Sequence, residues 1–168
     1  MNIVNVKDAD LRKAAENGMD EFVKVFVDAT LYCVGGQLNA DTMGMLNADQ
    51  ITLLAYHYLQ EEVMDGGFVQ LIHNGYGGFI FMNPFAKAVR EWGISELASL
   101  VNKARSLYYK HHEAIEKDCS DEEFMAMFER YSGFDDLDDK FVENEETWTS
   151  MVAHYIDEHI DRFAEITE

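Results

Sequence analysis

Apolar residues recur along most of the chain at the three- and four-residue spacing of amphipathic helices. The pattern is clear over residues 20–34, 48–65 and 95–117, where one side of each predicted helix is apolar. The chain holds a single proline, and its valines and isoleucines are not gathered into the short alternating runs of strands. The pattern predicts an all-α protein, a single compact domain over residues 1–168 with about seven to nine helices.

Local signals predict where several of these helices begin and break. Asn47 followed by Gln50, and Ser120 followed by Glu123, have the spacing of capping boxes at helix starts. The pair Gly66-Gly67 interrupts the apolar pattern of the first of these helices. We therefore expect a helix from about residue 48, broken at the two glycines, and another from about residue 121.

The stretch GFDDLDDKFVENEE, residues 133–146, holds seven carboxylates and one lysine. Its apolar residues Phe134, Leu137, Phe141 and Val142 fall at i, i+3, i+7 and i+8, which predicts an amphipathic helix with these residues inward and the acids outward. A calcium loop does not fit. Counted from Asp136, the sixth and twelfth positions are phenylalanine and threonine, where an EF-hand needs glycine and glutamate.

Charge narrows the classes of partner. The formal net charge is −19, and residues 116–168 contribute −14 of it, from 18 acids and 4 bases. Phosphates need compensating cations, so direct binding to nucleic acid or to an anionic membrane is disfavoured. The asymmetry favours a basic protein as partner, although solubility alone also explains it.

The cysteines and the first residues bear on location. Cys33 and Cys119 lie far apart and form no C-x-x-C pair, so we expect reduced, buried thiols. The first ten residues lack the basic and apolar regions of a signal peptide. No apolar run is long enough to span a bilayer. We expect a cytoplasmic protein without a membrane contact.

Motifs for catalysis or metal binding are missing from the sequence. It has no H-E-x-x-H, no G-x-S-x-G and no phosphate-binding glycine loop. We therefore expect no catalytic residue, metal or cofactor. The alternative from another class is a helical enzyme or metal protein, whose candidate groups are His57, His73 and His154 with Glu61 and Glu62.

One motif carries a family resemblance. Glu62, Gly66, Gly67, Phe68, Gln70 and Asn74 form the pattern E-x-x-x-G-G-F-x-Q-x-x-x-N. This pattern resembles the core motif of the bacterial DNA mimic protein family, the DNA mimic protein 19-like family, over about residues 45–165. We expect structural roles for the motif residues: the glycines permit a turn or a close helix approach, and Gln70 and Asn74 satisfy exposed backbone groups.

The resemblance implies an all-α fold, a homodimer, and a carboxylate surface that imitates DNA phosphates on the DNA-binding face of a transcription regulator. We therefore favour a non-enzymatic interaction protein with a basic partner. A dimeric scaffold whose acids serve only solubility remains open. The candidate binding residues come from the charge pattern, not from the motif, and are Asp135, Asp136, Asp138, Asp139, Glu143, Glu145 and Glu146, with Asp118, Asp121 and Glu122 nearby.

Overall fold

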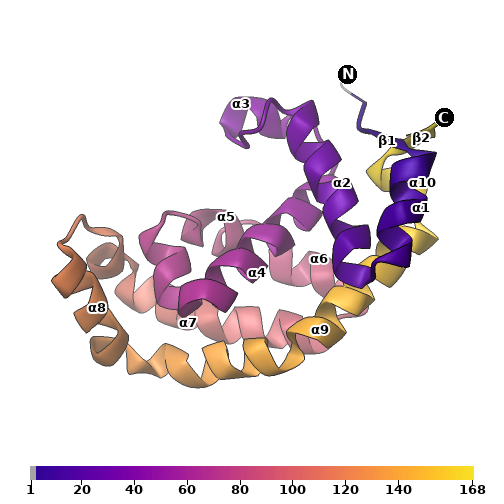
Figure 1. Ribbon diagram of the computed structural model, residues 1–168. Coiled ribbons are helices and arrows are strands. Elements are labelled where there is room, and N and C mark those ends of the chain that lie inside the picture. The colour runs from indigo at the N-terminus through magenta and orange to yellow at the C-terminus, as the bar shows by residue number, and fades with distance from the viewer. Residues whose placement is uncertain (1–2) are drawn as a thin grey trace. The chain divides into compact units, whose positions relative to one another are not determined.

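The computed structural model describes residues 3–168 (Figure 1). The elements in this part of the chain are β1 (Asn5–Lys7), α1 (Asp8–Glu16), α2 (Met19–Cys33), α3 (Ala40–Met43), α4 (Ala48–His73), α5 (Gly77–Phe81), α6 (Phe85–Glu91), α7 (Ser95–Glu116), α8 (Asp121–Arg130), the 3-10 turn η1 (Ser132–Phe134), α9 (Asp135–Glu158), α10 (Ile160–Phe163) and β2 (Glu165–Thr167). The all-α class is confirmed. The described residues hold ten α-helices rather than seven to nine, because α3, α5 and α10 are helices of four or five residues.

The described chain forms two compact units. Unit 1 comprises the residues up to Leu54 together with Glu146–Glu168, and unit 2 comprises Ala55–Glu145. Helix α4 therefore begins in unit 1 and continues in unit 2, whereas α9 begins in unit 2 and continues in unit 1. Each unit is described by itself below.

Unit 1 joins segments from both ends of the sequence. Phe26 of α2 lies edge-on to Phe163 of α10, with ring centroids 6.4 Å apart, and both rings are fully buried. Strands β1 and β2 pair in parallel, with Asn5 opposite Glu165 and Lys7 opposite Thr167. The sequence pattern did not predict this pair, because three residues are too few to show an alternation of apolar and polar positions.

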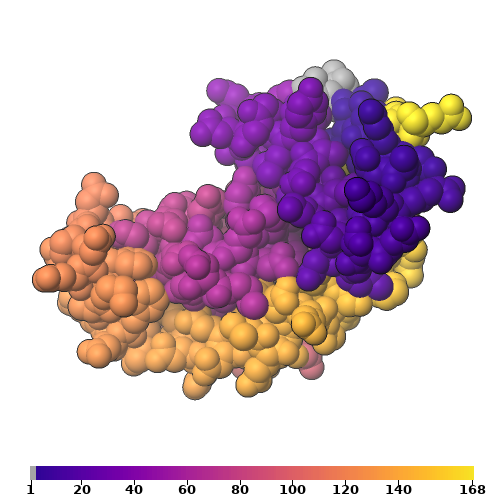
Figure 2. All heavy atoms as spheres, in the orientation of Figure 1, coloured from indigo at the N-terminus to yellow at the C-terminus, as the bar shows by residue number. Residues whose placement is uncertain are grey.

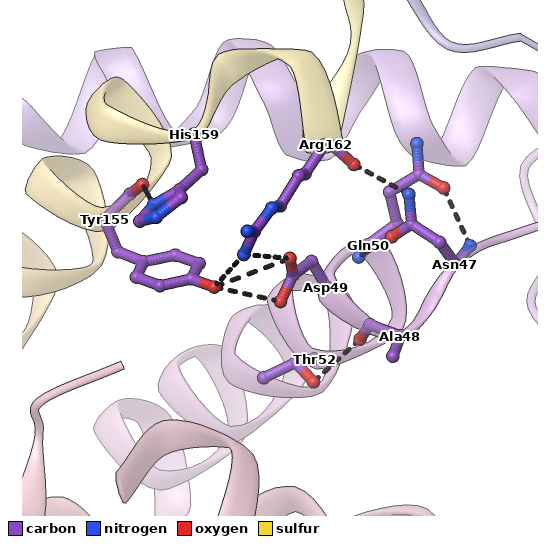
Figure 3. A network of polar contacts seen from close by, with 8 residues as sticks. All are labelled: Asn47, Ala48, Asp49, Gln50, Thr52, Tyr155, His159 and Arg162. Carbon is purple, nitrogen blue, oxygen red and sulfur yellow. Dashed lines mark hydrogen bonds and ion pairs between the residues drawn. The ribbon is translucent and has the colours of Figure 1, made fainter. Parts of the chain in front are cut away.

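The predicted capping box at the start of α4 is confirmed and has a second role in unit 1. The Asn47 side chain accepts a hydrogen bond from the Gln50 amide, and the Gln50 side chain accepts one from the Asn47 amide. The two side chains also donate to the carbonyl oxygens of Arg162 and Phe163, at 2.7 and 3.0 Å. Figure 3 shows Asn47 and Gln50 between the start of α4 and Arg162. The capping box therefore starts α4 and also bonds to the carbonyl groups at the end of α10.

Unit 2 is built around α7 and the central part of α4. The buried residues of α7 include Leu97, Val101, Ala104 and Tyr108, whose spacing of three and four gives one apolar face. The predicted cap at Ser120 is confirmed, since its hydroxyl accepts a hydrogen bond from the Glu123 amide at 3.2 Å.

The thiols differ from their prediction. Neither Cys33 nor Cys119 forms a disulfide, as expected, but each is only partly buried. The largest buried side chains are aromatic and leucine residues, so the core does not depend on the thiols. None of the helices in the described residues is both long enough and apolar enough to cross a membrane.

Candidate functional site

The two glycines break α4 in a conformation that other residues avoid. Gly66 has φ −148° and ψ 15°, and Gly67 has φ 75° and ψ −175°. The conformation of Gly67 is essentially restricted to glycine. A Cβ atom built on Gly67 would also lie 2.4 Å from Oδ2 of Asp138, which is closer than atoms can approach. Both the backbone conformation and the Asp138 side chain therefore favour glycine at position 67.

The Asp138 side chain caps the part of α4 that follows the two glycines. Its Oδ1 accepts a hydrogen bond of 2.8 Å from the amide of Phe68, the first residue after the glycines. A carboxylate in this place caps the new helix start, where backbone N–H groups lack partners. The pKa of Asp138 is raised to about 7, chiefly by burial; the nearby charges of Asp135 and Asp139 contribute to the rise, and the hydrogen bond from the Phe68 N–H opposes it.

The polar motif residues bond to one another. Glu62 Oε2 accepts hydrogen bonds from Gln70 Nε2 at 2.8 Å and from Asn74 Nδ2 at 3.0 Å, and Gln70 also donates to Asp65. The side-chain NH2 groups of Gln70 and Asn74 thus donate to carboxylates, whereas backbone groups were the expected partners. This network spans the glycine break and links the two parts of α4.

Phe68 joins the break to the acid-rich segment. It is fully buried, and its ring centroid lies 6.2 Å from that of Phe134 and 6.3 Å from that of Phe81. The motif therefore supplies an aromatic contact to η1 and a polar contact to the beginning of α9.

Most of the predicted binding acids are exposed. They are Asp135, Asp136, Asp139, Glu143 and Glu146 on α9, Asp121 and Glu122 in the first turn of α8, and Asp118 in the connection before it. Glu146 is the first residue of the returning segment of unit 1, and the other seven belong to unit 2.

Two of the predicted surface acids are not at the surface. Asp138 is partly buried against Phe68, and Glu145 is only 9% exposed and accepts a hydrogen bond from the Gln60 side chain. With Phe134 and Phe141 they are spaced by four, three and four residues, which places all four on one helix face. This spacing is visible in the sequence and could have indicated that Asp138 and Glu145 face inward. Val142, which was also expected to face inward, is 50% exposed.

Three of the exposed acids, Asp135, Asp139 and Glu143, form a row that we call the acidic stripe. They follow one another at i, i+4 and i+8 on α9, so each lies about 6 Å further along the helix axis than the one before. Among the described residues, none of the three forms an ion pair with a lysine, arginine or histidine. Their negative charge is therefore not neutralised by a neighbouring side chain.

The surplus charge of unit 2 is concentrated in one part of its sequence. Residues 55–115 carry six acids and five bases, whereas residues 116–145 carry twelve acids and three bases. Figure 2 shows the latter segment, in orange, on the surface of the molecule. Unit 1 is also negative, with fourteen acids and five bases, so the negative surplus of the whole chain is not confined to the stripe.

The histidines of the alternative hypothesis lie in separate contacts. In unit 2, His57 Nε2 is 3.5 Å from a carboxylate oxygen of Glu61, whereas His73 Nδ1 is 2.8 Å from the Ile115 carbonyl oxygen. In unit 1, His154 lines a cavity of about 240 Å³. Across residues 3–168, no three histidine, cysteine or acidic side chains are grouped so that they could hold a metal ion.

The Cys119 thiol is poorly suited to nucleophilic chemistry. Partial burial raises its pKa, and the carboxylates of Glu123, Asp118 and Asp121 raise it further. Because the thiolate is the reactive form, these surroundings disfavour a catalytic role for this cysteine.

Comparison with known proteins agrees with the motif. Residues 44–159 match the family described as DMP19-like protein. The DNA mimic protein DMP19 of Neisseria meningitidis serogroup B is 34% identical over 131 residues, which cover 77% of this chain and 79% of that protein. The matched range contains the glycine break, the acidic stripe and Asp138. The chain therefore belongs to the DMP19-like protein family.

Proposed function

We propose that this protein is a non-enzymatic DNA mimic. Its acidic surface on α8 and α9 occupies the DNA-binding face of a basic transcription regulator and excludes DNA from it. The relative from Neisseria is named as a DNA mimic, and the acid-rich segment of this chain lies in the range that matches the family. The single observation that carries the proposal is the exposed, unneutralised acidic stripe.

The spacing of the stripe supports imitation of a phosphate backbone. One strand of duplex DNA carries a negative charge about every 3.4 Å along the helix axis. The stripe carries one about every 6 Å, close to the spacing of every second phosphate. Lysine and arginine side chains that contact alternate phosphates could therefore meet these carboxylates with little rearrangement.

The mechanism is electrostatic attraction followed by steric exclusion. An uncompensated negative surface speeds the encounter with a basic partner, and this effect weakens as salt increases. Buried Phe134 and Phe141 hold the first part of α9 against unit 2, so the charges are presented on a folded helix. We also propose that the protein is a homodimer and that it acts in the cytoplasm, where it would encounter a transcription regulator.

Capture of partners from a lysate of the source organism tests the proposal. The stripe variant would be Asp135→Asn/Asp139→Asn/Glu143→Gln. The matched control, Asp10→Asn/Glu16→Gln/Glu21→Gln, removes the same charge from exposed positions of unit 1. We expect a basic DNA-binding protein to be retained at low salt by the wild type and the control, and to be lost at high salt or with the stripe variant. DNA should compete with the wild type for that protein.

Two results would contradict the proposal. One is recovery of no basic protein at low salt. The other is equal retention by the stripe variant and its control, which would support the second candidate function, a scaffold whose acids serve only solubility. The comparable negative charge of unit 1 is the observation that favours this second candidate.

A further inference from the structure

We propose that Asp138 is a positioning residue that fixes the rotation of α9 and so determines the direction in which the acidic stripe points. The inference rests on the proposed function, because it concerns how the same surface is held. Asp138 lies next to Asp139 in the sequence and one helical turn from Asp135, yet its own side chain turns inward to α4.

The apolar contacts at the beginning of α9 set its rotation only approximately, to within the width of its apolar face. Phe134 and Phe141 are buried, but hydrophobic contact is non-directional. A hydrogen bond, in contrast, requires a narrow range of distance and angle. The bond between Asp138 Oδ1 and the Phe68 amide joins residues 70 apart in the sequence, so it ties one side of α9 to one point on α4.

A second polar contact lies two turns further along the same face. Glu145 accepts a hydrogen bond from Gln60, and the two carboxylates are about 10.5 Å apart along the helix axis. Phe141 lies between them in the sequence. Two directional contacts on either side of a buried ring fix the helix against both rotation and sliding.

The glycine break makes the first of these contacts possible. Because Gly67 has no side chain, Oδ2 of Asp138 occupies the space in which a Cβ would lie. The break also exposes the Phe68 N–H as a donor at a helix start. The family motif and the acidic stripe are thus connected through Asp138.

The groups that face the Asp138 carboxylate are the Phe68 N–H from α4 and the charges of Asp135 and Asp139 from α9. Its charge state is therefore coupled to the stripe. A cation bound at Asp135 and Asp139 would reduce their repulsion of Asp138 and favour its ionised form. Binding of a cationic partner should consequently release a proton near neutral pH.

Hydrogen exchange of the Phe68 amide tests the contact without any partner. Asp138→Ala removes the acceptor, Asp138→Asn retains a carbonyl oxygen in its place, and Glu96→Gln is the control for loss of one exposed charge in unit 2. We expect at least tenfold faster exchange in Asp138→Ala and near wild-type exchange in the other two. Equal exchange in Asp138→Ala and Glu96→Gln would overturn the proposal.

Calorimetric titration with a peptide of ten lysines at low salt, between pH 5.5 and 8, tests the link to binding. We expect the affinity of the wild type and of Glu96→Gln to rise about two- to fivefold with pH as Asp138 ionises. Asp138→Asn should show a clearly smaller rise, because only the titrating groups common to all the variants remain. A rise of the same size in Asp138→Asn would overturn the proposal, even if Asp138→Ala fails to fold.

The same titration separates the two proposals. If the peptide binds the stripe variant and its unit 1 control equally, the proposed function fails, whereas the exchange experiment still decides the role of Asp138. If the stripe variant alone loses binding but the Asp138 variants behave like Glu96→Gln in both experiments, the proposed function stands and the positioning role is wrong.

Discussion

Replacement of Gly67 by alanine tests the connection between the family motif and α9. The backbone at Gly67 lies in a region that costs about 1–3 kcal/mol for other residues. The new Cβ would also displace the Asp138 carboxylate, and loss of a helix cap costs about 0.5–2 kcal/mol. We expect Gly67→Ala to lower the free energy of unfolding by roughly 1.5–5 kcal/mol in total.

The assay is urea unfolding followed by circular dichroism at 222 nm and by tryptophan fluorescence, since two compact units need not unfold in one step. Gly75→Ala is the matched control. Gly75 also has positive φ, 89°, but no atom lies within 4 Å of its added Cβ. Gly75→Ala should therefore cost only the backbone strain of positive φ, about 1–2 kcal/mol.

A double-mutant cycle isolates the contact with Asp138. In Gly67→Ala/Asp138→Ala the carboxylate is already absent, so the second substitution should cost less than it does alone, by at least about 0.5 kcal/mol. If the two substitutions are additive, and Gly67→Ala costs no more than Gly75→Ala, then Gly67 is required only for its backbone conformation. The close approach of α9 would not contribute to stability.

Three further predictions use the same unfolding assay. Phe68→Ala should lower the free energy of unfolding by about 3–5 kcal/mol, because it leaves a cavity beside two aromatic rings; a loss below 1 kcal/mol would contradict the packing described. Gln60→Ala should cost about 1–3 kcal/mol, because it leaves buried Glu145 without this donor, whereas Gln60→Glu at low pH should restore part of the loss. The folded-state pKa of Asp138, about 7, lies above its ordinary value of 3.8, so its contribution is full at acid pH and is lost as pH rises through 7. Asp138→Asn should therefore lose less stability than the wild type between pH 4 and 8, and identical profiles would show that Asp138 does not titrate in this range.

Local features of the sequence predicted much of the fold. The capping boxes at Asn47 and Ser120 depend on residues three apart, and the break at Gly66-Gly67 depends on two adjacent glycines. The helical periodicity of α7 repeats over 22 residues. Signals of this kind are contained in one segment, so they can be recognised without knowledge of the tertiary structure.

The features that the sequence did not predict depend on contacts between distant segments. Asp138 and Glu145 are charged, and charged residues are normally exposed, so they were assigned to the outer surface. Their partners, Phe68 and Gln60, lie 70 and 85 residues away, and no local pattern indicates either pairing. The helical spacing with Phe134 and Phe141 was visible, but only the structure shows donors that make inward carboxylates stable.

The discontinuous composition of unit 1 has a consequence for biosynthesis. Residues 146–168 belong to unit 1 but leave the ribosome after all of unit 2, which is one uninterrupted stretch. Residues 4–7 and the beginning of α4 must therefore wait for Arg162, Phe163 and β2, their partners in the capping contacts and the parallel strand pair. The hydrogen bonds that tie α9 to α4 in unit 2 close loops of 70 and 85 residues, whereas those of the capping box in unit 1 close loops of 115 and 113, so unit 1 has the larger loop-closure cost. The contacts that hold the acidic stripe lie entirely within residues 55–145 and therefore need none of residues 146–168.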